Sequence, residues 1–136
     1  METARWTDIL MLLTIAVVID RRVYKEEVDV FRRECLALCE ILTPDMIFSD
    51  KMAFDWFLVH RDKVMTWLME PHSNQKVISH LKKLSSEPER GRILQAFYAI
   101  SMADDECHPS EAEFIALAAS YWSLPNPIAS GRKVAS

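Results

Sequence analysis

Glycine is scarce in this sequence, with two residues among 136. Because glycine supplies positive φ angles, its scarcity argues against β-turn-rich folds, Rossmann folds and glycine-rich phosphate-binding loops. Cysteine is also rare: the three residues cannot all pair, and none belongs to a Cys-x-x-Cys motif. Reduced thiols are the simplest interpretation, so we expect a cytoplasmic protein without disulfides.

The chain also lacks a strong charge of either sign and a long apolar run. Its net charge is −4, and its 16 Lys and Arg residues are scattered rather than gathered into a basic stripe. We therefore expect no nucleic acid partner. The longest apolar stretch, residues 9–19, is about half the length that a membrane-spanning helix requires, and it does not resemble a signal peptide. We expect no membrane span and a buried central helix instead.

The apolar residues of the sequence follow a helical periodicity. Half of the residues are apolar, and they recur at three- and four-residue intervals rather than alternating with period two. The segments expected to be helical are 4–20, 25–42, 44–48, 50–70 as one helix or two, 73–84, 87–102 and 109–123. The sequence therefore predicts an all-α fold, a single-domain bundle of six to seven helices over residues 1–124. Residues 125–136 are polar and small, and we expect a flexible C-terminal tail there.

Three local features set the expected helix boundaries. Thr43 and Pro44 suit the N-cap and first position of a short helix that reaches Phe48. If residues 50–70 form two helices, the joint falls at residues 60–62. Ser86-Glu87-Pro88-Glu89 matches a capping box that starts the next helix.

An acidic helix–loop–helix segment occurs twice. Asp104 closes an apolar helix, and Glu111 follows seven residues later in the first turn of the next helix. Asp20 and Glu27 repeat this spacing 84 residues earlier. Two occurrences are too few for a solenoid, so we expect two helix pairs packed about a pseudo-two-fold axis. That arrangement would bring the two acidic loops together.

The doubled segment resembles the tellurite-resistance TerB-like family, which includes the N-terminal domain of a membrane-anchored DnaJ-type co-chaperone. The family pattern is an apolar helix ending in Ala-x-Ala-Asp-Gly, an apolar residue, and a Glu seven residues after the Asp. Residues 18–27 and 102–111 follow it, but Arg21 and Asp105 replace the Gly. If the loop needs a positive φ there, Asp tolerates it and Arg is strained. The resemblance implies a small all-α protein of the stress response with a divalent-metal site on the shared acidic residues.

Asp20 and Asp104 have two interpretations. Each closes a helix at its C-terminal end, where the helix dipole disfavours a carboxylate. Recurrence of this unfavourable charge in both copies suggests a bound counter-ion. Alternatively, each side chain accepts hydrogen bonds from loop N–H groups in an Asx turn.

Glu27 and Glu111 also have a structural interpretation. If Tyr24 and His108 are N-caps, both glutamates occupy the third helical position, where a carboxylate favours the dipole and bonds back to the cap. Pro109 at the first helical position fits this register. Capping alone would then explain the repeated spacing.

A metal site here would use five candidate ligands: Asp20, Glu27, Asp104, Asp105 and Glu111. Carboxylate oxygens suit Ca²⁺, Mg²⁺ or Mn²⁺, and the loop lacks the twelve-residue spacing of an EF-hand. Cys107 and His108 raise a Zn²⁺ option, which we favour less because adjacent residues rarely ligate together without a second pair. Cys107, Cys35 and Cys39 are expected in the core.

Nothing in the sequence has the pattern of an enzyme: it contains no HExxH motif and no Gly-rich phosphate loop. We therefore expect a non-enzymatic TerB-like binding module that has a protein partner and a divalent-cation site. One alternative is a metal-free protein-interaction adaptor in which the acidic residues only cap the loops. A metal-dependent hydrolase is a third and lesser alternative.

Overall fold

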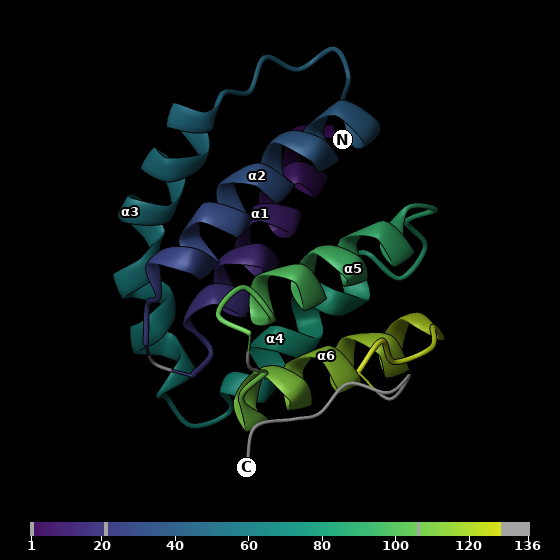
Figure 1. The fold of residues 1–136 in the computed structure, drawn as a ribbon. Helices are drawn as coiled ribbons and strands as arrows, with labels where there is room; N and C mark the ends of the chain where they lie inside the picture. The colour runs from purple at the N-terminus through teal and green to yellow at the C-terminus, as the bar shows by residue number, and fades with distance from the viewer. Residues whose placement is uncertain (1, 21, 106, 129–136) are drawn as a thin grey trace.

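The computed structural model describes residues 2–20, 22–105 and 107–128, which form six helices (Figure 1). These helices are α1 (Glu2–Val18), α2 (Lys25–Leu42), α3 (Asp50–Leu68), α4 (Ser73–Lys83), α5 (Arg90–Ser101) and α6 (Pro109–Trp122). The predicted all-α bundle is confirmed. The helix count over the described residues is the lower of the two expected.

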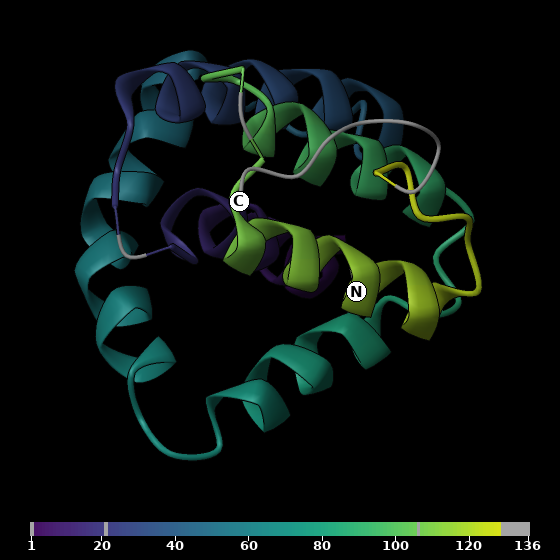
Figure 2. The ribbon, with the colours of Figure 1, turned by 60° about the horizontal axis from the view of Figure 1, so that its bottom comes forward.

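The helix α1 lies at the centre of the bundle. It packs against α2, α3, α4 and α5, which surround it in Figure 2. Residues 12–18 are each buried, including Thr14, whose hydroxyl donates to the carbonyl of Leu10 at 2.8 Å. The prediction of an enclosed central helix is confirmed, because its apolar side chains cover nearly the whole circumference. Within the described residues, no helix is long and apolar enough to cross a membrane.

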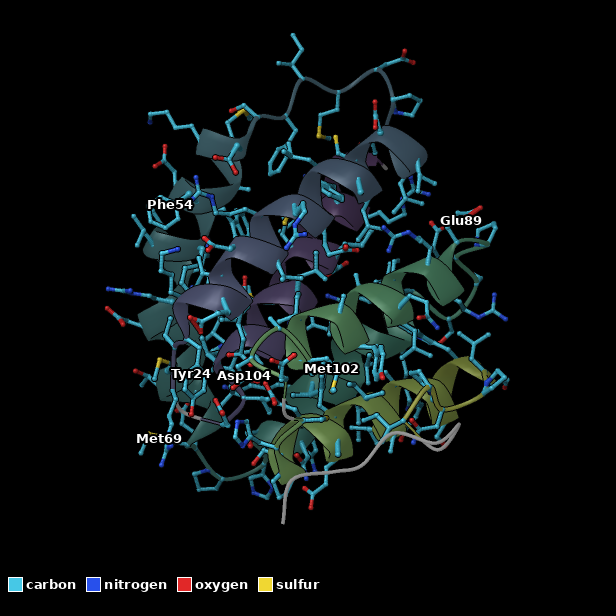
Figure 3. The ribbon with its side chains drawn as sticks, viewed as in Figure 1. Tyr24, Phe54, Met69, Glu89, Met102 and Asp104 are labelled. Carbon is cyan, nitrogen blue, oxygen red and sulfur yellow. The ribbon has the colours of Figure 1, made fainter. Side chains whose placement is uncertain are left out.

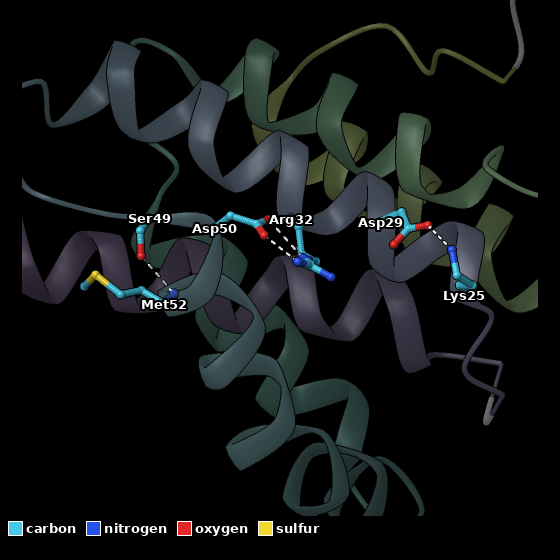
Figure 4. Close-up of polar contacts among 6 residues, drawn as sticks. All are labelled: Lys25, Asp29, Arg32, Ser49, Asp50 and Met52. Atoms are coloured by element: carbon cyan, nitrogen blue, oxygen red, sulfur yellow. Dashed lines mark hydrogen bonds and ion pairs between the residues drawn. The ribbon is translucent and has the colours of Figure 1, made fainter.

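The helix α3 is continuous through the proposed joint at residues 60–62. Ser49 caps it, its hydroxyl accepting a hydrogen bond from the Met52 amide at 3.1 Å (Figure 4). His60 lies within the helix, with Nδ1 at 2.8 Å from the Trp56 carbonyl and its ring stacked on the Trp56 ring. This local contact lets a polar residue remain inside the helix.

Two predicted boundaries are wrong. Residues 44–48 form no helix, because Thr43 ends α2 instead of starting a new one: its amide and its hydroxyl both donate to the Cys39 carbonyl, at 2.9 and 3.2 Å. The capping box at residues 86–89 is also absent, and α5 begins at Arg90. Glu87 is buried there, pairing with Arg5 at 2.6 Å and accepting from the Glu89 amide at 2.8 Å.

The predicted C-terminal tail is described only as far as residue 128. Ile128 is 7% exposed and belongs to the core cluster, and its amide donates to the Asn126 side chain at 2.9 Å. The beginning of this segment therefore packs on the bundle. Residues 129–136 lie outside the described residues.

Candidate metal centre

The two acidic segments meet at one end of the bundle. Packing of α2 against α5 and of α5 against α6 brings the α1–α2 connection beside the α5–α6 connection. Tyr24, before α2, stacks on His108, before α6, with ring centroids 5.9 Å apart and planes within 10°. Tyr24 and Asp104, which both contact His108, are labelled in Figure 3. The expected meeting of the two acidic connections is therefore present in the fold.

Glu27 and Glu111 lie at the base of this junction, and both are 0% exposed. Each is the third residue of its helix, as the N-cap interpretation predicted. Glu111 Oε1 accepts a hydrogen bond from the His108 amide at 3.0 Å, so capping is confirmed for α6. Both carboxylate oxygens of Glu27 and Oε2 of Glu111 have no hydrogen-bond partner among the residues that the structure describes. Capping therefore gives a hydrogen-bond partner to only one of the four carboxylate oxygens of Glu27 and Glu111.

The surroundings of these carboxyl groups favour their protonated forms. Burial, followed by the adjacent Glu111 carboxyl and the charges of Asp20 and Asp104, raises the pKa of Glu27 to about 10. Burial also raises the pKa of Glu111, although its contacts with Glu27 and the His108 amide oppose the shift. Two carboxyl groups this close can form a hydrogen bond only by sharing a proton. Without a cation, the pair therefore retains a proton at neutral pH.

Asp20 and His108 also belong to this acidic cluster, and unlike Glu27 and Glu111 they are partly exposed to solvent. One potential ligand atom from each of Asp20, His108 and Glu111 lies within 4.8 Å of the other two. Asp20 Oδ1 also accepts from the Arg22 amide at 3.1 Å, which is the Asx turn that the sequence allowed. His108 Nε2 lies 3.3 Å from Asp104 Oδ2. Three of the five predicted ligands, Asp20, Asp104 and Glu111, thus lie near the His108 imidazole, and Glu27 interacts with Glu111.

Asp105, the fifth predicted ligand, has a different position. Its side chain is exposed, and its ligand atoms are not part of the group that surrounds Glu111. Its φ is 69°, in the left-handed region where the family pattern has glycine. The expectation that Asp would adopt this conformation is confirmed. Arg21, at the matching position of the first loop, lies outside the described residues.

His108 is the site residue that sequence reasoning missed. As a ligand it is considered only as half of a Cys107–His108 zinc pair, yet Cys107 is 0% exposed and separate from the potential ligand group. Burial, with the charges of Glu111, Asp104 and Glu27, raises the pKa of the Cys107 thiol to about 11. The signal that could have identified His108 is its three-residue spacing from Glu111 across a helix start, which places both on one side of the first turn.

No family model, no curated protein and no solved structure matches this chain. Its function therefore has to be inferred from the chemistry of the cluster.

Proposed function

We propose that this protein is a divalent-cation-binding module whose α1–α2 and α5–α6 connections jointly hold one cation. The observation that supports this is the carboxylate of Glu27, which is 0% exposed and has no hydrogen-bond partner in the described part of the chain. Buried polar groups in folded proteins normally have partners, and a buried charge needs a counter-charge or a proton. A cation beside Glu27 and Glu111 would supply the counter-charge.

The cation would be held by groups from both helix pairs. Potential ligand atoms of Asp20, from the first pair, and of Glu111 and His108, from the second, lie close together, and Glu27, which interacts with Glu111, would add an oxygen from the first pair. Binding would therefore connect two segments that are far apart in the sequence. The connections at this end of the bundle would then differ between the free and bound states, which would control a protein-partner surface.

This function agrees with what the TerB-like resemblance implies. A non-enzymatic binding module of the stress response needs a site whose occupancy reports a signal, and the acidic cluster is the strongest candidate for it. The carboxylates that define the resemblance also meet electrostatically, since, besides burial, Glu111, Asp20 and Asp104 all raise the pKa of Glu27.

Two hydrogen bonds favour a second candidate, a metal-free adaptor. Asp20 bonds to the Arg22 amide and Glu111 bonds to the His108 amide, so both acids also serve as local caps. In this alternative, a proton shared by Glu27 and Glu111 permanently replaces the cation.

Calorimetric titration of chelator-treated protein with Mn²⁺, Zn²⁺, Ca²⁺ and Mg²⁺ separates the two functions. We expect binding tighter than millimolar and a higher melting temperature, because a ligand at 100 times its Kd stabilises the folded state by about 2.7 kcal/mol. Glu27→Gln should abolish both effects. Glu26→Gln, at the exposed neighbouring position of α2, is the matched control and should retain them. Absence of binding by every cation, with an unchanged melting temperature, would leave the adaptor.

A further inference from the structure

We infer that the cation at this site is a first-row transition ion such as Mn²⁺, Fe²⁺ or Zn²⁺, rather than Ca²⁺ or Mg²⁺, because His108 provides a nitrogen ligand. This inference rests on the proposed cation site and specifies the class of ion that it binds.

The positions of the ligand atoms are compatible with a single ion. One atom from each of Asp20, His108 and Glu111 lies within 4.8 Å of the others. Ligands at about 2.1 Å from an ion are separated by at most about 4.2 Å, so a small inward adjustment of these side chains would complete the contacts. Glu27 lies beside Glu111, and its carboxylate, 0% exposed, has no other partner within the described ranges.

His108, whose side chain takes part in a capping box with Glu111, has two further contacts. Its Nε2 lies 3.3 Å from Asp104 Oδ2, and its ring stacks on Tyr24 at 5.9 Å. Metal-bound imidazoles commonly use their second nitrogen to donate to a carboxylate, which fixes the orientation of the ring. Asp104 therefore acts as a positioning residue for His108.

The donor set discriminates between classes of ion. Imidazole nitrogen suits Fe²⁺ and Zn²⁺ and carboxylate oxygen suits Mn²⁺, so a mixed donor set accepts first-row transition ions, whereas Ca²⁺ takes six to eight oxygens and Mg²⁺ retains water and oxygen ligands. The His108 nitrogen beside the oxygens of Asp20 and Glu111 therefore favours a transition ion.

His80 provides a closely matched control. Its side chain is 23% exposed and lies 3.1 Å from Asp8, and that of His108 is 23% exposed and lies 3.3 Å from Asp104. His80 is not part of the potential ligand group. Replacing either histidine removes a similar aspartate–histidine contact, but only one replacement removes the nitrogen near Glu111.

The experiment is a titration of wild-type protein, His108→Gln and His80→Gln with Mn²⁺, Zn²⁺, Ca²⁺ and Mg²⁺. We expect Mn²⁺ and Zn²⁺ to bind the wild type at least 100-fold more tightly than Ca²⁺ and Mg²⁺. His108→Gln should weaken Mn²⁺ binding at least tenfold, and His80→Gln should leave it unchanged. Pulsed electron paramagnetic resonance of the Mn²⁺-loaded wild type should show coupling to an imidazole nitrogen, a readout that does not depend on any variant folding correctly.

The two proposals fail in different ways. If no cation binds the wild type, both the cation site and its ion class are wrong. If Ca²⁺ or Mg²⁺ binds as tightly as Mn²⁺, or if the Mn²⁺ spectrum contains no nitrogen coupling, the site remains and this inference is wrong. Unchanged affinity in folded His108→Gln, verified by circular dichroism, would also overturn it.

Discussion

Glu27 and Glu111 occupy the same position in two related helices, yet Glu111 bonds back to its N-cap amide and Glu27 makes no such bond to any described residue. Both side chains are 0% exposed, and each affects the pKa of the other. A third-position glutamate is ordinarily explained by capping. Here that explanation covers one member of the pair, so the other must be neutralised by a proton or a cation.

The first prediction concerns the pH dependence of stability in the metal-free protein. The pKa of Glu27 rises from an ordinary value of 4.5 to about 10 on folding, so folded protein binds a proton that unfolded protein releases between these values. The free energy of unfolding should therefore fall as pH rises through this range, by up to about 1.4 kcal/mol per pH unit. Urea denaturation with chelator present, at pH 6, 7, 8 and 9, measures this slope.

Glu27→Gln should flatten that slope, because the amide does not titrate. Glu26→Gln should leave the slope intact, since Glu26 is exposed on the same turn of α2. Equal slopes in wild type and Glu27→Gln would show that the carboxyl pair does not retain its proton.

The second prediction concerns Asp105, whose φ of 69° lies in the left-handed region. Asp105→Gly should raise the free energy of unfolding by up to about 1 kcal/mol, since glycine adopts this conformation without strain. Cation affinity should not change, because Asp105 is outside the potential ligand group. Chemical denaturation and Mn²⁺ titration test both parts, and a large loss of affinity would place Asp105 in the site.

The third prediction concerns the partly buried ion pair that replaced the expected capping box. The Glu87 side chain is 4% exposed and contacts Arg5 at 2.6 Å, while Arg5 also donates to the Leu42 carbonyl at 2.9 Å. Glu87→Ala should lower the free energy of unfolding by about 2–4 kcal/mol, because it removes the counter-charge of Arg5. Urea denaturation measures the change.

The matched control for Glu87 is a surface ion pair. Lys25 and Asp29 contact at 2.9 Å with side chains 83% and 46% exposed (Figure 4). Lys25→Ala should lower stability by less than about 0.5 kcal/mol, because exposed pairs are hydrated and lose side-chain entropy. Similar effects of the two substitutions would mean that burial does not strengthen the Arg5–Glu87 contact.

The fourth prediction concerns thiol reactivity. Cys35, Cys39 and Cys107 are all buried, and burial raises the pKa of Cys35 and takes that of Cys107 to about 11. The thiolate is the reactive form, so native protein should react with a disulfide reagent at pH 8 at least 100-fold more slowly than urea-unfolded protein. In the unfolded protein, the reagent should count three thiols. Rapid labelling of one thiol in native protein would show that the structure opens at that residue.

Most of the fold could be predicted from local pattern. The bounds of α2 agree with the apolar spacing of residues 25–42, and the burial of α1 follows from its apolar circumference. The errors arose where long-range contacts overrode local preference. Glu87 pairs with Arg5, which is 82 residues away, and no local motif around Ser86 reveals that contact.

The candidate site likewise contains residues that the sequence identifies and residues that only long-range contacts reveal. Asp20, Glu27, Asp104 and Glu111 could be identified from a repeated spacing, because a helix–loop–helix unit keeps its acidic positions in the sequence. His108 could not be assigned in this way, since its contacts with Tyr24 and Asp104 and its proximity to Asp20 depend on how two connections meet. Asp105 was included because it is acidic, and its left-handed backbone conformation is a further feature of this position.

By itself, the sequence determined the helical class of this protein and the two matching acidic connections, because periodicity and spacing are properties of local chain segments. Only the tertiary structure decided that the connections meet, that Glu27 is buried without a hydrogen-bond partner among described residues, and that an imidazole joins the carboxylates. The reason is physical: packing of α2 on α5 and of α5 on α6 determines which loop residues approach one another, and charges excluded from water need a partner that packing alone does not provide.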